Sequence, residues 1–322
     1  MASTKSPLNN RLIGSADMPL KVIHQITDVF RRRLDRLRYP PNKVSPLTYV
    51  DKALEPKIIP NYQQEIPFNV WQTWKTTHLP PPIARTIRRF RSNNPEYAHH
   101  LMTDAECGHF IEEHFSGTRT EQAYFRINPD FGAARADFWR YCVLFQYGGV
   151  YLDIDSTCLT PLRDFIAAKD SAVLSQEKNQ VGSWETDLDI FNEPGFLAEP
   201  PEEIIPRPTN VFLQWMLIFS PKHPLLAAVI ENVTNAVLNY HELVPNRRPG
   251  GQARTIYLTG PLRFTDTIWK LIQTSPTFFD QVRIDGVDFQ GKAIFQFPGH
   301  AEKNRQSKHY SKLGTSFVLP TP

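Results

Sequence analysis

Residues 132–155 read GAARADFWRYCVLFQYGGVYLDID, and this stretch decides the fold class. Its first part, 132–147, is alanine-rich and largely apolar, which predicts a long, largely buried helix. The two glycines at 148–149 end that helix, because glycine adopts tight-turn conformations without steric cost. Residues 150–154 then predict a buried strand. A helix that feeds directly into a strand is typical of an α/β protein.

The segments on both sides continue the alternation of strands and helices. Upstream, the patterns predict a strand at 68–71, an arginine-rich helix at 83–91, a strand at 97–102 and a helix opened by the capping sequence at Thr103. Downstream, they predict helices at 210–219, 225–238 and 264–272 and a short strand at 293–297. Residues 178–208 are rich in Glu and Pro and predict a long loop or lid. We expect an α/β fold with a mainly parallel central sheet.

The composition is that of a globular protein with nearly balanced charge. The chain has 322 residues, of which 41% are apolar, and its 36 basic and 33 acidic residues give a net charge of +3. This balance argues against nucleic acid as a partner, so a phosphate-bearing ligand must be held by local groups. Of the three cysteines, Cys142 is expected to be a small core residue. Whether Cys107 and Cys158 form a disulfide stays open.

The first 65 residues form a separate region before the predicted folded domain at 66–322. Residues 1–17 are polar, and apolar and basic residues then alternate at helical spacing over 20–38. This basic amphipathic helix can dock on the main domain, which is the favoured alternative, or make peripheral contact with a membrane. Residues 39–65 are expected to be a proline-containing connector. No run reaches the roughly 18 uncharged apolar residues of a membrane-spanning helix.

Two aspartates, Asp153 and Asp155, follow the apolar run of the predicted strand. In open α/β sheets, ligands collect at the carboxyl ends of the strands. If the strand continues, these two side chains point to the same side, and two carboxylates there suit Mn²⁺ or Mg²⁺ carrying a diphosphate. A second D-x-D, at Asp187 and Asp189, has no apolar strand before it. We interpret that second pair as a solvated or lid cluster.

Asp137 and Arg140 lie three residues apart in the predicted helix and share one face. One interpretation is a surface ion pair, which is worth only about 0.3 kcal/mol. The other is a functional pair, since both charges stand in an otherwise apolar helix that leads directly to Asp153. The apolar surroundings favour the functional interpretation.

Residues 134–162, ARADFWRYCVLFQYGGVYLDIDSTCLTPL, resemble the DXD-containing sugar-nucleotide region of family 32 glycosyltransferases. Members of that family include the Och1-like α-1,6-mannosyltransferases. Further segments resemble the family's other motifs. The opening motif is IP…WQTWK at 66–75, and the segment from 210 to the H-P turn at 223–224 resembles a helix that ends in this turn. The T-G-P motif is at 259–261, and the closing motif is H…GTSF at 309–317. The resemblance covers roughly residues 66–318.

This resemblance implies a GT-A fold, a nucleotide-diphosphate sugar donor, a divalent cation (Mn²⁺ or Mg²⁺) and retention of configuration. It implies that Asp137 and Arg140 hold hydroxyls of the donor sugar. Tyr151 and Asp153 would contact the nucleotide, the sugar or the metal. Asp155 would bind the metal directly.

The two ends of the resembling region supply the remaining predicted site residues. Trp71 would stack on the nucleotide base. His309 and Ser316 would face the metal or the diphosphate. Phe317 stands where the family pattern has tryptophan, so any indole N–H contact to phosphate is lost.

The resulting expectation is an enzyme that moves mannose from GDP-mannose to a glycan or other hydroxyl acceptor. Alternatives are a UDP-sugar donor, a lipid or small-molecule acceptor, and a sugar-nucleotide-binding protein without catalysis. Residues 153–157, DIDST, also resemble the haloacid-dehalogenase phosphatase motif, but about 150 residues precede them and no later acid pair of the required type follows. The family resemblance implies the Golgi, while the lack of an apolar anchor leaves the cytoplasm or a membrane surface open.

Overall fold

The computed structural model describes residues 46–177, 211–240, 252–275, 282–299 and 315–320, together with Leu37, Ala301 and Lys303. The chain divides into two compact units, Met1–Lys43 and Val44–Pro322. The helix expected at 20–38 lies outside the described residues, apart from Leu37. In the part of the chain that the structure describes, no helix is long and apolar enough to cross a membrane.

The centre of the second unit is a seven-stranded sheet in the order β10-β8-β9-β6-β3-β5-β2. Five strands run in the same direction, and β9 and β2 run against them. The sheet strands are β2 (Ala53–Leu54), β3 (Asn69–Thr73), β5 (Ala98–Met102), β6 (Gly149–Leu152), β8 (Ala172–Gln176), β9 (Met216–Phe219) and β10 (Val282–Val287). Smaller sheets pair β1 (Thr48–Tyr49) with β4 (His78–Leu79) and β7 (Ser156–Cys158) with β11 (Ala293–Phe295). The α/β architecture with a mainly parallel sheet, expected for a GT-A fold, is confirmed.

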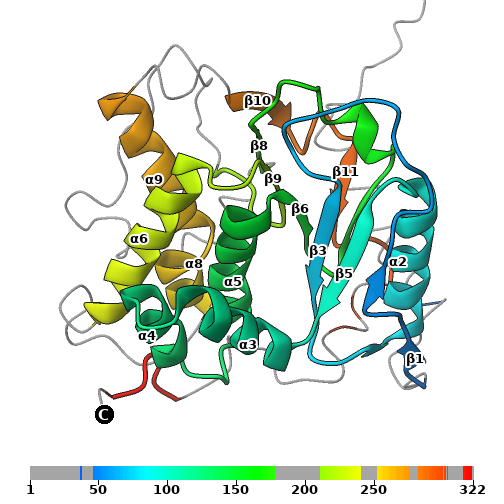
Figure 1. The fold of residues 1–322 in the computed structure, drawn as a ribbon. Coiled ribbons are helices and arrows are strands. Elements are labelled where there is room, and N and C mark those ends of the chain that lie inside the picture. The colour runs from blue at the N-terminus through cyan, green and yellow to red at the C-terminus, as the bar shows by residue number, and fades with distance from the viewer. Residues whose placement is uncertain are drawn as a thin grey trace, which may run out of the picture. The chain divides into compact units, whose positions relative to one another are not determined.

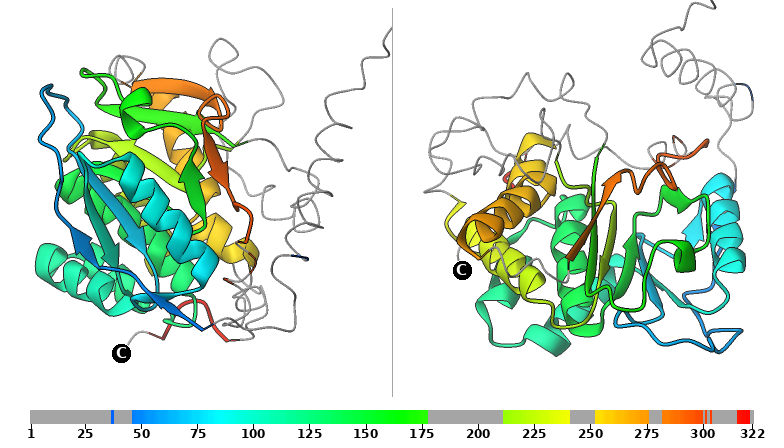
Figure 2. Two further views of the ribbon diagram at one scale, coloured as in Figure 1. Left: turned by 90° about the vertical axis from the view of Figure 1, so that its right-hand side faces the viewer. Right: turned by 90° about the horizontal axis from the view of Figure 1, so that it is seen from above.

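Helices cover both faces of this sheet. They are α2 (Pro81–Asn93), α3 (Asp104–Phe115), α4 (Arg119–Arg126), α5 (Gly132–Tyr147), α6 (Pro224–Leu238), α8 (Gln252–Leu258) and α9 (Pro261–Thr274), with a short 3₁₀ helix at Leu162–Asp164. Figure 1 shows α5, α6, α8 and α9 on one side of the sheet and α2 on the other. The same layers are seen from two further directions in Figure 2. The sequence did not predict α4 and α8.

Several local predictions are confirmed by the backbone contacts. The hydroxyl of Thr103 accepts a hydrogen bond from the Glu106 N–H, and the Glu106 carboxylate accepts one from the Thr103 N–H, so the capping box opens α3. The helix predicted at 132–147 is α5 with the same bounds. Ordered structure begins before residue 66, however, because β1 and β2 lie in the expected connector.

The sequence pattern predicted a helix at 210–219, but the described residues 211–219 do not form one. Met216–Phe219 is strand β9, which lies antiparallel between β6 and β8. All four residues are buried, so the strand shows no alternation of polar and apolar positions. Without that alternation, a short apolar run cannot be distinguished from a helix by its period. The H-P turn therefore begins a helix instead of ending one, with His223 as the N-cap of α6.

The two faces of the sheet carry different hydrophobic clusters. Trp71 and Tyr151 are paired across β3 and β6, and both belong to the cluster that includes the buried face of α5. Val70 and Val150 are paired one position earlier and belong to the second cluster. Because side chains alternate along a strand, Tyr151 faces α5 and Val150 faces the other side of the sheet. This alternation defines the face from which the turn after β6 begins.

The three cysteines are free and buried. Cys107 belongs to the cluster on the α5 side of the sheet, and Cys158 belongs to the other cluster. The structure therefore has no disulfide between them. Cys142 is a fully buried core residue, as predicted.

The turn between α5 and β6 depends on glycine. Gly149 has a φ of +102°, and a Cβ atom there would lie 2.4 Å from the carbonyl oxygen of Asn69. We expect Gly149→Ala to lower the free energy of unfolding by roughly 1–3 kcal/mol from backbone strain alone, and by more through the contact with Asn69. Urea denaturation measures this loss.

The matched control for this substitution is Gly132→Ala. A Cβ atom at Gly132 meets nothing within 4 Å and stands at the start of a helix. This variant should be neutral or slightly more stable than the original chain. Equal stability of the two variants would contradict the described geometry of the turn at Gly149.

Candidate functional site

Arg140, in α5, is the centre of a buried charge cluster. Its Nη2 lies 2.9 Å from Asp137 Oδ1 and 3.2 Å from Asp153 Oδ1. Its Nη1 donates to the carbonyl oxygen of Gln214 at 2.9 Å, and its guanidinium carbon lies 4.4 Å from the centre of the Tyr151 ring. Asp137 and Arg140 are only 7% and 5% exposed. The alternative of a surface ion pair is therefore wrong, and the structure brings together four predicted site residues.

The pKa values within this cluster depend on burial and on the neighbouring charges. Burial raises the pKa of Asp137 to about 7, although Arg140 opposes this shift, and the Asp153 carboxylate adds to it. Burial by itself would lower the pKa of Arg140, but the negative charges around it, Asp153 first, bring that pKa above its usual value. Arg140 therefore stays charged, while burial makes Asp137 hold its proton more tightly than an exposed carboxyl group does.

Asp153 and Asp155 do not lie on one continuing strand. Strand β6 ends at Leu152, and the N–H of Ser156 donates to the carbonyl oxygen of Asp153 at 2.9 Å, which closes a turn before β7. The prediction that both carboxylates point to the same side required a continuing strand, and the strand ends before both residues. Asp153 Oδ1 accepts a hydrogen bond from the Tyr151 hydroxyl at 2.7 Å. The two acids are presented by a turn, each with its own partners.

Asp155 is 3% exposed and has the features of a cation ligand. Its Oδ2 lies 3.1 Å from Nζ of Lys303. Its Oδ1 is buried and has no hydrogen-bond partner among the residues that the structure describes. Buried carboxylate oxygens are nearly always paired, so an unpaired one fits a metal ligand. No cluster of three or more potential protein ligands exists within the described ranges, so phosphate oxygens and water would have to complete the shell of a bound ion.

Thr259 also holds Asp137, through a contact that was not predicted from the sequence. The Thr259 hydroxyl donates to Asp137 Oδ2 at 3.1 Å. The carbonyl oxygen of Thr259 accepts hydrogen bonds from the Tyr141 hydroxyl at 3.0 Å and from Gln214 Nε2 at 3.1 Å. The T-G-P motif had marked Thr259 without indicating this contact. Asp137 is therefore fixed between a cation and a hydroxyl group.

Residues 80–179 match the family described as "Glycosyltransferase sugar-binding region containing DXD motif". This range contains α5, β6 and the turn that carries Asp153 and Asp155. The resemblance to DXD-containing glycosyltransferases is confirmed.

Curated relatives extend the similarity beyond that region. An initiation-specific alpha-1,6-mannosyltransferase of Candida albicans is 30% identical over 235 residues, which are 68% of this chain and 57% of the relative. Inositol phosphoceramide mannosyltransferase 3 of Schizosaccharomyces pombe is 26% identical over 238 residues, which are 73% of this chain and 53% of the relative. The chain thus spans little more than half the length of these two relatives. A solved structure of PaToxG glycosyltransferase covers 79% of this chain and 78% of its own, with a TM-score of 0.44 and 14% identity.

Trp71, which the glycosyltransferase resemblance assigns to the nucleotide base, is a core residue in this structure. It is 8% exposed, and its indole N–H donates to the carbonyl oxygen of Gly148 at 2.9 Å. Its ring stacks on His100 with 4.2 Å between centroids, and the ring of Tyr147 is stacked at 5.8 Å. A base can therefore stack on Trp71 only after these neighbours move. That role stays a prediction.

Phe317, which departs from the glycosyltransferase pattern, anchors the closing segment of that pattern. Phe317 is fully buried, and its ring lies 4.9 Å from that of Phe131. Ser316 donates from its hydroxyl to the carbonyl oxygen of Val318 at 2.8 Å, and its own carbonyl oxygen accepts from Asn128. These contacts involve none of the other predicted site residues. His309 lies outside the described residues, so its predicted role remains untested.

Glu177, at the carboxyl end of β8, is an acidic residue that the sequence analysis did not single out. Burial raises its pKa to about 7, and the charges of Asp288 and Asp153 add to this shift. Because β8 runs in the same direction as β6, Glu177 lies at the same edge of the sheet as Asp153. Asp187 and Asp189, the second D-x-D, lie outside the described residues.

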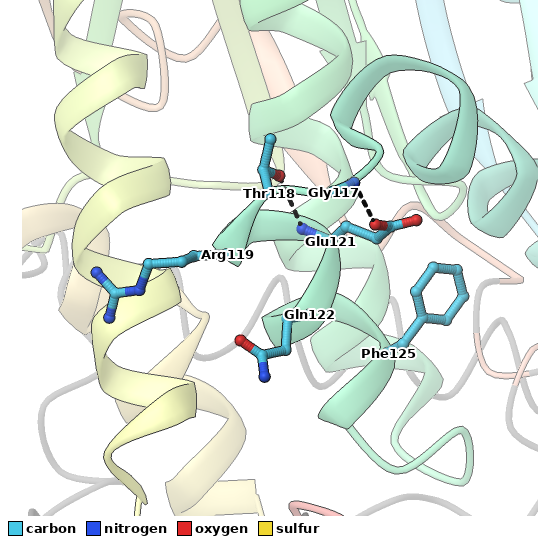
Figure 3. Close-up of a pocket in the computed structure, with 6 residues that line it drawn as sticks. All are labelled: Gly117, Thr118, Arg119, Glu121, Gln122 and Phe125. Carbon is cyan, nitrogen blue, oxygen red and sulfur yellow. Dashed lines mark hydrogen bonds between the residues drawn. The ribbon is translucent and has the colours of Figure 1, made fainter. Parts of the chain in front are cut away.

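A surface hollow of about 450 Å³ lies elsewhere, around the start of α4. Figure 3 shows its lining, which comes from Gly117, Thr118, Arg119, Glu121, Gln122 and Phe125. Thr118 and Glu121 are engaged in capping α4 and closing the preceding turn. None of the predicted donor-site residues lines this hollow.

Proposed function

We propose that this chain is a metal-dependent, retaining glycosyltransferase that moves mannose from GDP-mannose to a glycan or another hydroxyl acceptor. The observation that carries the proposal is the buried Asp137–Arg140–Asp153 cluster beside Asp155, whose Oδ1 has no partner among the described residues. The family match over 80–179 supports sugar transfer, and the names of the relatives support mannose.

The cluster has suitable groups for holding a sugar. Asp137 offers carboxylate oxygens that accept hydrogen bonds from hydroxyls, and Arg140 offers N–H groups that donate to them. Both are fixed in direction by Thr259 and by the carbonyl oxygen of Gln214. Fixed groups of this kind orient a bound substrate without further loss of side-chain entropy. We therefore assign the donor sugar to this end of the site.

Asp155 and Asp153 would hold the Mn²⁺ or Mg²⁺ ion, with His309 proposed as a further ligand. The ion would supply positive charge to the diphosphate as that group leaves. Tyr151 donates to Asp153 Oδ1 and thereby directs that carboxylate. Arg140 adds a second fixed partner on the same oxygen.

The reaction balances without a protein nucleophile. The acceptor oxygen forms a bond to the anomeric carbon while the bond from that carbon to the diphosphate oxygen breaks. The electron pair stays on the leaving phosphate, which takes the proton of the acceptor hydroxyl. Approach of the acceptor from the face that the diphosphate leaves gives retention of configuration. The products are a mannoside and GDP.

The nature of the acceptor divides the proposal into two candidates. The initiation-specific mannosyltransferase relatives favour a glycan. The inositol phosphoceramide mannosyltransferase relatives favour a lipid head group, and this is the second candidate. A Golgi location would fit both candidates, and residues 20–38 could add peripheral membrane contact.

The test is a panel of nucleotide sugars offered with Mn²⁺, followed by analysis of released nucleotide and of transfer to glycan and inositol-lipid acceptors. The proposal expects GDP release from GDP-mannose that depends on the metal. Metal-dependent release of UDP from a UDP-sugar would change the proposed donor but would still support a glycosyltransferase. Hydrolysis of phosphomonoesters without any response to sugar nucleotides would support the phosphatase alternative and reject the proposal. Binding without turnover would support a non-catalytic protein.

A further inference from the structure

Lys303 is a cation beside the proposed metal ligand that no motif had marked. Its ammonium lies 3.1 Å from Asp155 Oδ2, and the side chains of the two residues are 31% and 4% exposed. The carboxylate of this ion pair is therefore buried, and the lysine side chain is partly exposed to solvent. Such a pair leaves the ammonium accessible to a ligand that enters from solvent.

Within the described ranges, the ammonium has capacity for a further partner. Lysine carries three N–H donors, and the contact with Asp155 uses one of them. Arg140, by contrast, already contacts Asp137, Asp153 and the carbonyl oxygens of Gln214 and Ala136, so it has little N–H capacity beyond a contact with the sugar. The guanidinium of Arg140 therefore lies at the end of the proposed site that would hold the sugar. Lys303 lies at the end that would hold the metal ion.

Carboxylate ligands offset the charge of a divalent cation, so a further cation helps to balance the negative charge that develops on a leaving diphosphate. A lysine ammonium is a compact point charge on a flexible stem and binds phosphate readily. In the absence of donor, the same ammonium neutralises the buried carboxylate of Asp155. An ion held by that carboxylate would compete with the ammonium for Oδ2, and the ammonium could then donate to another anion.

We propose that Lys303 is a diphosphate-binding residue of the donor site, paired with Asp155 while the site is empty and donating to the diphosphate when donor and metal enter. The inference rests on the proposed function. During transfer, the bond between the anomeric carbon and the diphosphate oxygen breaks and its electron pair stays on that oxygen. Lys303 stabilises this charge and keeps its own protons.

The experiment compares Lys303→Met and Lys303→Arg with the original chain by calorimetry. The ligands are Mn²⁺ alone, and GDP, UDP or GMP in the presence of Mn²⁺. Lys303→Met should bind GDP about 10–100-fold more weakly, because a hydrogen bond to a charged group is lost, while GMP binding stays the same. It should bind Mn²⁺ alone about two- to fivefold more tightly, because a competing cation is gone. Lys303→Arg should keep most of the affinity for GDP.

The matched control is Lys169→Met, which removes the same charge from an exposed position before β8. Since β8 runs parallel to β6, Lys169 lies toward the opposite edge of the sheet from the carboxyl ends. This variant should bind all ligands like the original chain.

Two results would overturn the role proposed for Lys303 without affecting the proposed function. One is equal weakening of GDP and GMP binding in Lys303→Met, which is the behaviour of a residue that only holds the local structure. The other is unchanged binding of GDP. Failure of the original chain to bind either GDP or UDP with Mn²⁺ is distinguishable from both, and it would reject the proposed function together with this inference. The tighter binding of Mn²⁺ also separates the proposal from simple misfolding, which weakens every ligand.

Discussion

Replacing Arg140 with methionine is expected to lower the free energy of unfolding by about 3–5 kcal/mol, the cost of breaking a buried ion pair by removing one partner. The substitution leaves the carboxylates of Asp137 and Asp153 without the guanidinium that lies within 3.2 Å of both. It also leaves the carbonyl oxygen of Gln214 without its 2.9 Å donor. Urea denaturation at pH 8 measures the loss.

The loss should be smaller at low pH. The pKa of Asp137 is about 7 in the folded protein, against an ordinary value of 3.8. A carboxyl group with a raised pKa contributes stability that is fully present below the ordinary value and is lost as the pH rises through 7. Removing Arg140 takes away the charge that favours the ionised form, so the loss of stability continues to higher pH. The difference between the variant and the original chain should therefore be larger at pH 8 than at pH 5.

Arg126→Met is the matched control for this prediction. Arg126 donates to the carbonyl oxygen of Leu238 at 3.0 Å, and its loss should cost only about 1 kcal/mol without a comparable pH dependence. Arg140→Lys keeps the charge but loses the planar fork, so its stability should lie between those of the original chain and Arg140→Met. Equal losses in Arg140→Met and Arg126→Met would contradict the buried cluster as the structure describes it.

The sequence predicted the elements around the site because their signals are local. The helix α5 ends at two glycines with positive φ, and β6 follows at once, so one short stretch contains every boundary signal. The strand β9 had no such signal, since it is buried on both faces and shows no period of two. Its place between β6 and β8 comes from tertiary packing, which overrides local pattern.

The site was predictable to the extent that its residues are close together in the chain. Asp137, Arg140, Tyr151 and Asp153 lie within 17 residues and meet as expected. Thr259, by contrast, reaches Asp137 across 122 residues. Lys303 is even further along the chain from its partner Asp155, and neither contact has a periodic or motif signal. Such pairings depend on the fold, and a sequence without aligned relatives carries no trace of them.

Asp155→Asn is expected to lower metal-dependent sugar transfer by on the order of a thousandfold while the protein stays folded. The substitution keeps the size of the side chain and replaces a charged oxygen ligand with an amide. Asp155 is exposed by only 3%, but its Oδ1 has no donor to lose among the described residues. The loss of the ion pair with Lys303 should therefore be the main effect on stability. Initial rates of GDP release at saturating Mn²⁺ and thermal unfolding together measure the two quantities.

Two further variants serve as comparisons for Asp155→Asn. Asp130→Asn removes the same charge from an exposed position between α4 and α5, and it should leave transfer unchanged. Asp153→Asn should lose stability as well as transfer, because Asp153 Oδ1 accepts from both Tyr151 and Arg140. The two acids of the D-x-D thus differ in their other contacts, since Asp153 is also part of the charge cluster and Asp155 is not. If Asp155→Asn retains metal-dependent transfer at the original rate, Asp155 is not a metal ligand, and its role in the proposed function is wrong.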